Sequence, residues 1–374
     1  MTQTPPSDFR VQRSSRDAST VPDRLATWLA TVLPEGADPV VTLEGGVDTT
    51  GMSSETLVLD AAWTQAGGPR IGRFVARVAP ADDDVPVFPG YDLPGQYDVM
   101  RLVGELTEVP VPTVRWLEPT GDVLGMPFFL MDRVEGHVPP DVMPYTFGDN
   151  WLFDASPTQR RRLQDTTIDT IAALHAIPDA DTRFGFLEPD APGRTPLARS
   201  LAEVRRWHTF AAEGIGPSRL VERGLAWLEA HLPDGTDTVL SWGDSRIGNV
   251  IYEDFTPVAV LDWEMAGVGP RELDLAWLVF SHRVFQTIAA AFGLPGMPDF
   301  LREEDVRAAY AERTGVEVGD LSWFQLFAAV QWAIVFLRTG TRQLRFGEIE
   351  PPGEVEELMH HRPLLEQLLD EVHA

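Results

Sequence analysis

The stretch SWGDSRIGNV, residues 241–250, places an aspartate, Asp244, and an asparagine, Asn249, five positions apart between apolar segments. A second stretch, VAVLDWEMAG at 258–267, again sets an acid, Asp262, directly after a β-branched run. The runs NVIY and PVAVL predict a short hairpin around EDFTP. In such a hairpin Asn249 and Asp262 lie at the same open end, and Asp244 comes beside them from the incoming loop.

Three oxygen-bearing side chains that converge in this way suit a hard cation such as Mg²⁺. The same order of residues meets the requirements of phosphoryl transfer. These are an aspartate that takes the hydroxyl proton, an asparagine for metal after four intervening residues, and a second aspartate for metal after a hairpin. The alternative is that all three are ordinary turn residues, because Asp and Asn side chains often bond to nearby backbone groups. The spacing alone does not decide between these interpretations.

The composition limits the classes of protein that fit this chain. Its 374 residues are enough for two domains, and no apolar run is long enough for a membrane span. Residues 1–20 lack the apolar segment of a secretory signal, and they predict a mobile tail. There is no cysteine, which excludes disulfides, thiolate metal sites and cysteine nucleophiles. We therefore expect a cytoplasmic protein without a membrane partner.

The net charge is strongly negative, and all the basic residues are of one type. The net charge of −27 argues against a nucleic-acid partner, which needs a basic face. It is compatible with a cationic ligand, or it serves solubility alone. All 30 basic residues are arginines, so a site that ordinarily uses lysine must use arginine here.

The hydrophobic pattern changes in character along the chain. It predicts helices at 22–34 and 96–108 and strands at 40–46, 54–63, 72–79, 109–118 and 126–134. After residue 135 helical spacing dominates, at 157–177, 219–233, 271–292, 303–315, 321–340 and 352–374. The sequence thus predicts an α+β fold with a β-rich N-lobe at 21–133 and a mainly helical C-lobe at 134–374.

Several motifs together resemble one family. The runs SWGDSRIGNVIY and VAVLDWEMAGVGPRELDLAW resemble the aminoglycoside phosphotransferase-like kinases, closely the branch related to the kinase domain fused to some acyl-CoA dehydrogenases. That branch reads H-G-D-x-R-x-x-N, then V-L-D-W-E-x-A-x-x-G-x-P-x-x-D-L-A-W. Upstream, GMSSETLVLD resembles its phosphate loop, and VPVPTVRWLE with LGMPFFLMDRVEG resembles the strand pair before its hinge. The matches keep their order over about residues 40–280, and they imply a bilobal protein-kinase-like fold.

The resemblance implies a role for each matching residue. Asp244 is the expected catalytic base, and Asn249 and Asp262 are the expected Mg²⁺ ligands. Arg77 takes the position of the strand lysine that grips the ATP phosphates, a task for which a guanidinium is suited. The remaining ATP-binding residues expected are the phosphate turn (Gly51, Ser53, Ser54, Thr56) and the linker that meets adenine (Met131, Asp132, Val134).

Two positions depart from the family pattern. Trp242 stands where the family has a histidine that braces the loop, and we expect the ring to replace it by packing. Gln96 stands where a glutamate pairs with the basic strand residue. A neutral amide makes no ion pair, so Asp92 or Asp98 is the alternative partner for Arg77.

Further residues near the motifs carry open alternatives. Arg246 contacts the transferred phosphate or pairs with a neighbouring acid. Glu264 is a second metal ligand, a substrate contact or a surface residue. Asp274 is expected to cap a helix or brace the loop, and His175 to support the core or the loop.

The resemblance implies an ATP- and Mg²⁺-dependent kinase that phosphorylates a hydroxyl group of a small molecule. The first acceptor expected is an aminoglycoside or related aminosugar, and the alternative is a hydroxyacyl group linked to CoA. Two rival functions use the same residues. One is a nucleotide-binding pseudokinase, which Gln96 and Trp242 favour, and the other is a metal-dependent hydrolase.

Overall fold

The computed structural model describes residues 17, 19–44, 53–141, 143–234 and 237–373. Contacts divide the chain into two units, Met1–Asp98 with Pro112–Arg133, and Val99–Val111 with Val134–Ala374. In the described part of the chain, no helix has both the length and the apolar character needed to cross a membrane.

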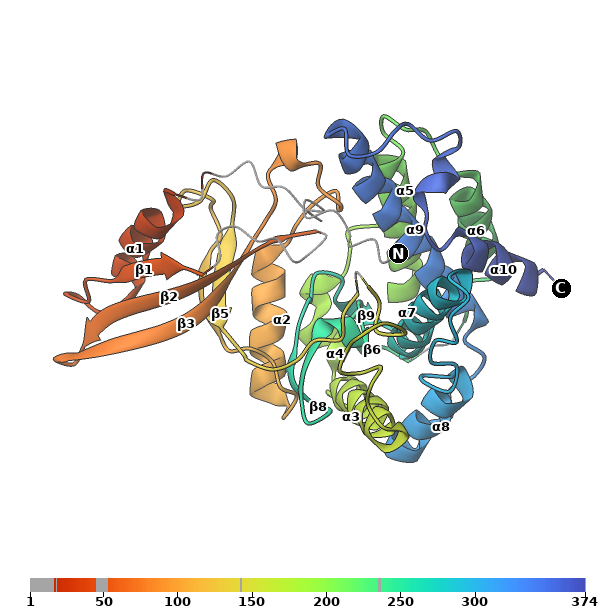
Figure 1. The fold of residues 1–374 in the computed structure, drawn as a ribbon, viewed down its shortest axis with the longest axis horizontal. Coiled ribbons are helices and arrows are strands. Elements are labelled where there is room, and N and C mark those ends of the chain that lie inside the picture. Colours follow the sequence, from red (N-terminus) through yellow and green to blue (C-terminus); the bar gives the residue numbers. More distant parts are fainter. Residues whose placement is uncertain (1–16, 18, 45–52, 142, 235–236, 374) are drawn as a thin grey trace. The chain divides into compact units, whose positions relative to one another are not determined.

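An antiparallel sheet of five strands forms the centre of the first unit (Figure 1). In sheet order the strands are β1 (Val40–Leu43), β2 (Glu55–Gln65), β3 (Gly68–Val78), β5 (Phe128–Asp132) and β4 (Val114–Glu118). Alternate residues of β2 are buried, as expected for a sheet with one covered face. Helix α1 (Val21–Val32) covers that face, and the ring of Trp28 meets Phe128 edge-on at 4.7 Å between centroids.

A short 3₁₀ helix, η1 (Asp82–Asp84), precedes helix α2 (Leu93–Leu106). The side chain of Asp92 caps α2, because its Oδ1 accepts a hydrogen bond of 2.9 Å from the Gly95 N–H. The boundary between the two units falls within α2, after Asp98.

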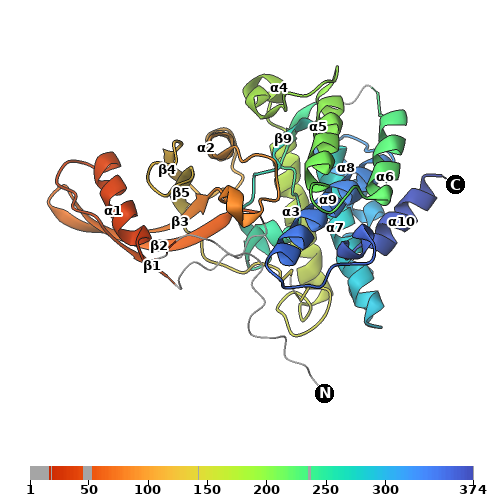
Figure 2. The same cartoon turned by 90° about the horizontal axis from the view of Figure 1, so that it is seen from above.

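The second unit is mainly helical (Figure 2). Its α-helices are α3 (Pro157–His175), α4 (Ala180–Arg183), α5 (Pro196–Ala211), α6 (Arg219–Ala230), α7 (Glu272–Ala291), α8 (Glu303–Thr314), α9 (Ser322–Arg345) and α10 (Arg362–Glu371). The 3₁₀ helices are η2 (Gly185–Leu187), η3 (Ile247–Asn249) and η4 (Val355–Leu358). Helix α9 is the centre of the packing, since α5, α6, α7 and α10 all contact it.

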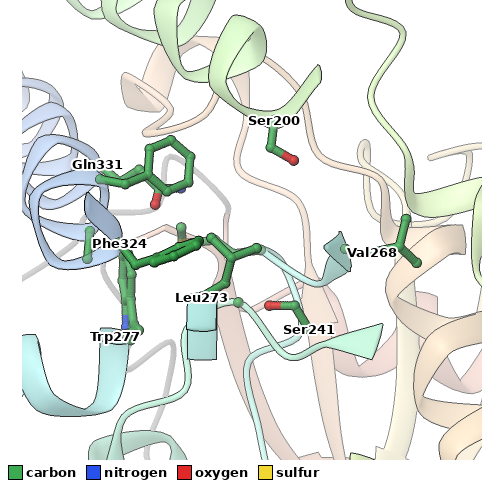
Figure 3. A pocket seen from close by; sticks show the side chains of 12 residues that line it. Ser200, Ser241, Val268, Leu273, Trp277, Phe324 and Gln331 are labelled. Atoms are coloured by element: carbon green, nitrogen blue, oxygen red, sulfur yellow. The ribbon is translucent and has the colours of Figure 1, made fainter. Parts of the chain in front are cut away.

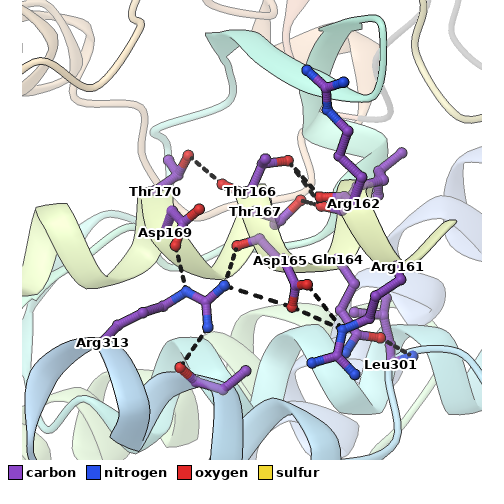
Figure 4. A network of polar contacts seen from close by, with 12 residues as sticks. Arg161, Arg162, Gln164, Asp165, Thr166, Thr167, Asp169, Thr170, Leu301 and Arg313 are labelled. Atoms are coloured by element: carbon purple, nitrogen blue, oxygen red, sulfur yellow. Dashed lines mark hydrogen bonds and ion pairs between the residues drawn. The ribbon is translucent and has the colours of Figure 1, made fainter. Parts of the chain in front are cut away.

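Helix α3 is fixed at its start and along its length. Ser156 and Gln159 form a reciprocal capping box at its N-terminus. Arg313 of α8 joins it further along, through ion pairs with Asp165 and Asp169 (Figure 4). The α3–α8 pair thereby gains polar contacts in addition to its packing.

Two small antiparallel pairs of strands lie among these helices. Strands β7 (Val250–Glu253) and β8 (Thr256–Val260) form the predicted hairpin, and Val250 is the register partner of Val260. Strand β6 (Val239–Ser241) pairs with β9 (Gly267–Gly269). These pairs bring residues 241–249 and 261–267 together, so they position the loops that carry the predicted site.

The α+β prediction is confirmed, as are the main predicted helices and strands. The predicted elements did not include α4, α5 or β9, and the helix expected at 352–374 is interrupted between η4 and α10. A start signal for α5 is present, because Thr195 caps it with a bond of 3.1 Å and Pro196 is its first residue. Strand β9 is only GVG, which has little strand propensity of its own.

Candidate active site

One buried carboxylate holds the backbone of the loop that follows β6. Asp274, in the first turn of α7, is fully buried. Its Oδ1 accepts hydrogen bonds from the Ser241 hydroxyl and the Gly243 N–H, both at 2.9 Å. Its Oδ2 accepts one from the Trp242 N–H, also at 2.9 Å. These are the contacts of a residue that braces the loop from the start of a helix.

A series of hydrogen-bonded side chains supports Asp274. The Nε2 of His175 lies 3.0 Å from Asp274 Oδ2, and its Nδ1 lies 2.9 Å from the Tyr310 hydroxyl. Because a carboxylate only accepts, Nε2 of His175 carries the proton of that bond. Arg271 donates to the Tyr310 oxygen at 3.0 Å, and burial raises the pKa of Tyr310, which therefore keeps its proton. His175 thus has the supporting place expected for it.

Gly243 is required by the shape of the loop. Its φ is +90°, and a Cβ at this position would lie 2.0 Å from the carbonyl oxygen of Met265. Any side chain would therefore push the loop away from the segment between Asp262 and β9.

The carboxylate of Asp244 is held by two donors. The indole Nε1–H of Trp277 donates to Oδ1 at 2.6 Å. The Nε–H of Arg246 lies between both oxygens, at 3.1 Å from Oδ1 and 3.2 Å from Oδ2. The side chain of Asp244 is only 14% exposed, so these bonds fix its orientation in a largely buried place.

Arg246 pairs with acids, which is one of the two alternatives left open for it. Its guanidinium also donates to Asp141. This contact was not predicted, because the two residues are far apart in the sequence. Burial acts to lower the pKa of Arg246, but the carboxylates of Asp141 and Asp244 outweigh it and raise the pKa.

The backbone brings Asn249 and the residue before Asp262 into direct contact. The Leu261 N–H donates to the Asn249 carbonyl at 2.8 Å. The indole of Trp242, which is fully buried, donates to the Leu261 carbonyl at 2.8 Å. Trp242 therefore ties the loop to the hairpin end through a hydrogen bond as well as by packing.

The side-chain oxygens at this end of the hairpin are suitable ligands for Mg²⁺. Asn249 uses its amide nitrogen to bond the Asp244 carbonyl at 3.0 Å, which directs its Oδ1 elsewhere. That oxygen and the Asp262 carboxylate are hard ligands. Among the described residues no cluster of three His, Cys, Asp or Glu side chains could hold a metal alone. Mg²⁺ is, however, usually bound by one or two carboxylates together with substrate phosphates and water.

The first unit carries the predicted phosphate-binding residues. Ser53 and Ser54 are buried just before β2, and Thr56 on β2 is the register partner of Arg77 on β3. The hydroxyl of Tyr91, which sequence reasoning missed, donates to the Ser53 carbonyl at 3.0 Å. Gly51 lies outside the described residues.

In the predicted linker, backbone groups are better placed than side chains to bind a ligand. Met131 and Asp132 end β5, and the Asp132 N–H already donates to the Thr113 carbonyl at 2.9 Å. Arg115 holds both oxygens of Asp132, at 2.7 and 2.5 Å, and this bond raises the pKa of Arg115. Among the described residues none accepts from the Val134 N–H. Val134 is therefore the better candidate to meet adenine.

The position of the expected glutamate remains without an ion pair. Gln96 is buried in the first half of α2, and its side-chain amide makes no hydrogen bond to the described part of the chain. Asp92 uses one oxygen to cap α2, as described above. Asp98 lies further along the same helix, and Arg77 keeps its place on β3.

A small pocket of about 70 Å³ lies between Ser241, Trp277 and Phe324 (Figure 3). Gly243 and Trp277 line it, and both adjoin Asp244 in the chain or in space. The rest of the lining is apolar or uncharged, from α5, α7, α9 and the β6–β9 region. None of the described residues that line it is acidic or basic. Glu264, half-buried in the turn before β9, is not among them.

Comparison with known sequences gives the same family over most of the chain. The model of the phosphotransferase enzyme family (APH) matches residues 62–312. Acyl-CoA dehydrogenase family member 11 of Homo sapiens is 27% identical over 170 residues, which is 45% of this chain and 20% of that protein. Family member 10 of Mus musculus is 26% identical over 184 residues, 49% of this chain and 16% of that protein. The chain thus spans a fifth or less of the length of these two relatives.

Solved structures share the fold. A proposed aminoglycoside phosphotransferase from Ralstonia eutropha JMP134 aligns with a TM-score of 0.63 at 21% identity, covering 93% of this chain and 97% of that one. A thermostable mutant of aminoglycoside phosphotransferase APH(4)-Ia, solved with ADP and hygromycin B, aligns with a TM-score of 0.52 at 14% identity, covering 92% of this chain and 98% of that one.

Proposed function

The chain belongs to the phosphotransferase enzyme family, and we propose that it transfers the γ-phosphoryl group of ATP to a hydroxyl of a small molecule, with Mg²⁺. The observation that carries this proposal is the held carboxylate of Asp244 next to the Asn249–Asp262 end of the hairpin. Phosphoryl transfer depends mainly on positioning and charge stabilisation, and such an arrangement supplies both.

In this reaction the acceptor oxygen forms the new bond to phosphorus. The bond from the γ-phosphorus to the bridging oxygen breaks, ADP leaves, and the hydroxyl proton passes to Asp244. Asn249 and Asp262 would hold Mg²⁺, which when bound neutralises charge on the phosphates. Ser53, Ser54 and Thr56 with Arg77 would contact the phosphates, and the Val134 backbone would meet adenine.

Two acceptor classes are supported by different observations. An aminoglycoside or aminosugar is favoured by the net charge of −27 and by a fold neighbour solved with hygromycin B. A hydroxyacyl group linked to CoA is favoured by the uncharged pocket that Gly243 and Trp277 line. An uncharged lining of this kind, in which Leu273, Phe324 and Phe327 are apolar, can accept a short alkyl segment, whereas it offers no carboxylate to an ammonium group. The relatives among the acyl-CoA dehydrogenase family members support the same class.

The test is ADP production by the purified chain with ATP and Mg²⁺, against kanamycin, simple sugars and 3-hydroxybutyryl-CoA. We expect acceptor-dependent ADP, with a phosphorylated product of matching mass. Asp244→Asn should lower kcat by about 10²–10⁴-fold, the usual contribution of a general base, and leave ATP affinity within a few-fold. Asp370→Asn, an exposed aspartate on α10, is the matched control and should behave as wild type.

The rival functions predict other results. Tight ATP binding with no transfer to any acceptor, even at high enzyme concentration, would favour a pseudokinase. Cleavage of a phosphate ester without ATP would favour a hydrolase. Either outcome would overturn the proposal.

A further inference from the structure

We propose that Trp277 is a positioning residue that fixes one oxygen of Asp244, so that the other oxygen, Oδ2, receives the proton of the acceptor. This inference rests on the proposed function. Its starting point is the 2.6 Å bond from the Trp277 Nε1–H to Asp244 Oδ1, between two side chains that are both largely buried. A bond from a neutral donor to a carboxylate in such a place is strong and short.

The two oxygens of Asp244 are not equivalent. Each carboxylate oxygen has two lone pairs that can accept. Oδ1 accepts from both Trp277 and Arg246, whereas Oδ2 accepts only from Arg246 among the described residues. Oδ2 therefore keeps the free capacity that a hydroxyl proton requires.

Two side chains of helix α7 hold the loop, one as a hydrogen-bond acceptor and the other as a donor. Asp274 and Trp277 are three residues apart, so they lie on the same face of the helix. Asp274 accepts from the loop backbone, and Trp277 donates to the side chain of Asp244. The same helix face thus fixes the backbone of the loop and the direction of its carboxylate.

The ring of Trp277 is also a wall of the pocket that Ser241 and Phe324 line (Figure 3). A group that enters the pocket packs on the ring whose N–H holds the base. An acceptor bound there would be aligned with the base against one rigid side chain, which favours a near-attack geometry.

A second tryptophan offers a matched control. Trp332 on α9 packs against Trp277, with ring centroids 5.7 Å apart, and is also buried. Its Nε1–H has no hydrogen-bond partner in the described part of the chain. Trp277→Phe and Trp332→Phe therefore remove the same group from the same aromatic cluster, but only the first loses a bond to Asp244.

The kinetic test uses whichever of kanamycin, the sugars and 3-hydroxybutyryl-CoA supports ADP production. Trp277→Phe should lower kcat by about 10–100-fold, as expected for losing a hydrogen bond to a charged group. The KM values for ATP and acceptor should change by less than about 3-fold, since the phenyl ring keeps the pocket wall. Trp332→Phe should keep kcat and both KM values near those of wild type. An unchanged kcat in Trp277→Phe, or an equal loss in both variants, would overturn the inference.

A spectroscopic test keeps the contact separate from activity. In ¹H–¹⁵N spectra of the tryptophan-labelled chain, Trp277→Phe assigns the indole signal of Trp277 and Trp332→Phe that of Trp332. Asp244→Asn should move the Trp277 signal strongly upfield and leave the Trp332 signal in place, because only the first bonds a carboxylate. A Trp277 signal that does not respond would refute the contact. A wild-type chain without acceptor-dependent ADP would instead overturn the proposed function, and with it the role of Trp277, whatever this signal does.

Discussion

Asp262 adopts a backbone conformation that is costly for a residue with a side chain. Its φ is +60°, and Asp254, in the turn of the same hairpin, has a φ of +47°. A left-handed conformation costs about 1–2 kcal/mol, although aspartate tolerates it better than most residues. The turn between β7 and β8 explains Asp254. At Asp262 the chain has already left β8, so the turn does not explain its conformation, and strained residues of this kind cluster at functional sites.

Replacing Asp262 with glycine separates its backbone role from its chemistry. Glycine adopts the same φ without strain but loses entropy on folding, so the free energy of unfolding should stay within about 1 kcal/mol of wild type. Mg²⁺-dependent ATP binding should be lost, because one of the two proposed ligands is gone. Titration calorimetry with ATP, with and without Mg²⁺, measures this.

Asp254→Gly is the control for that experiment. It makes the same chemical change at a similar φ in the same hairpin, and it should keep wild-type ATP affinity. Normal Mg²⁺-dependent affinity in Asp262→Gly would show that Asp262 is structural.

At the scale of the element, one buried charge of α7, the carboxylate of Asp274, accepts most of the hydrogen bonds by which this helix holds the loop. Asp274 accepts four hydrogen bonds, from Ser241, Trp242, Gly243 and His175. A carboxylate can satisfy four donors, whereas an amide presents one oxygen and a nitrogen that itself donates. An asparagine here would leave buried N–H groups facing its own N–H.

Asp274→Asn should therefore lower the free energy of unfolding by about 2–5 kcal/mol, since each buried group left unpaired costs about 1–3 kcal/mol. It should also lower kcat, because the loop carries Asp244. Asp23→Asn is the comparison, as Asp23 also lies in the first turn of a helix, α1, but is exposed. Its effect should stay within about 0.5 kcal/mol. Urea unfolding measures both, and equal small effects would contradict the anchoring role.

The elements that the sequence predicted are those with a strong local signal. The hairpin of β7 and β8 and the long helices carry clear periodicity, so their place could be read from residue spacing. Strand β9 could not, because GVG becomes a strand only by pairing with β6. Helix α5 was missed although its signal is present, since Leu197, Leu201 and Val204 recur at helical spacing.

At the scale of the molecule, local motifs predicted Asp244, Asn249 and Asp262 as candidate site residues. They did not predict the distant side chains that contact this loop. Asp141 lies 105 residues from Arg246 in sequence, and Trp277 lies 33 residues from Asp244. Such contacts follow from the packing of whole elements and leave no spacing to read. The uncharged pocket has the same origin, since its walls come from separate helices.

The second unit also contains buried histidines that should make its stability depend on pH. Burial lowers the pKa of both His282 and His361 to about 4, and it lowers the pKa values of His208 and His360 as well. His282 is bonded as a neutral ring, by Tyr145 at 3.0 Å and the Met297 carbonyl at 3.1 Å.

The sign of the effect follows from these directions. In the unfolded chain the histidines take up a proton near pH 6.5. In the folded chain His282 and His361 take up a proton only near pH 4. The unfolded state therefore binds more protons in this window. Stability is complete above pH 6.5 and falls with decreasing pH, by about 1.4 kcal/mol per pH unit for each histidine.

Urea unfolding between pH 7 and 5 measures this slope, above the range where most carboxylates titrate. Tryptophan fluorescence follows the second unit, because only Trp28, Trp63 and Trp116 belong to the first. His282→Gln with His361→Gln should flatten the slope, since glutamine keeps an N–H donor but takes up no proton. His231→Gln, which alters an exposed ring, should leave the slope unchanged. A double variant that is as pH-sensitive as wild type would mean that the buried rings accept protons in the folded state, and it would place the acid sensitivity elsewhere in the unit.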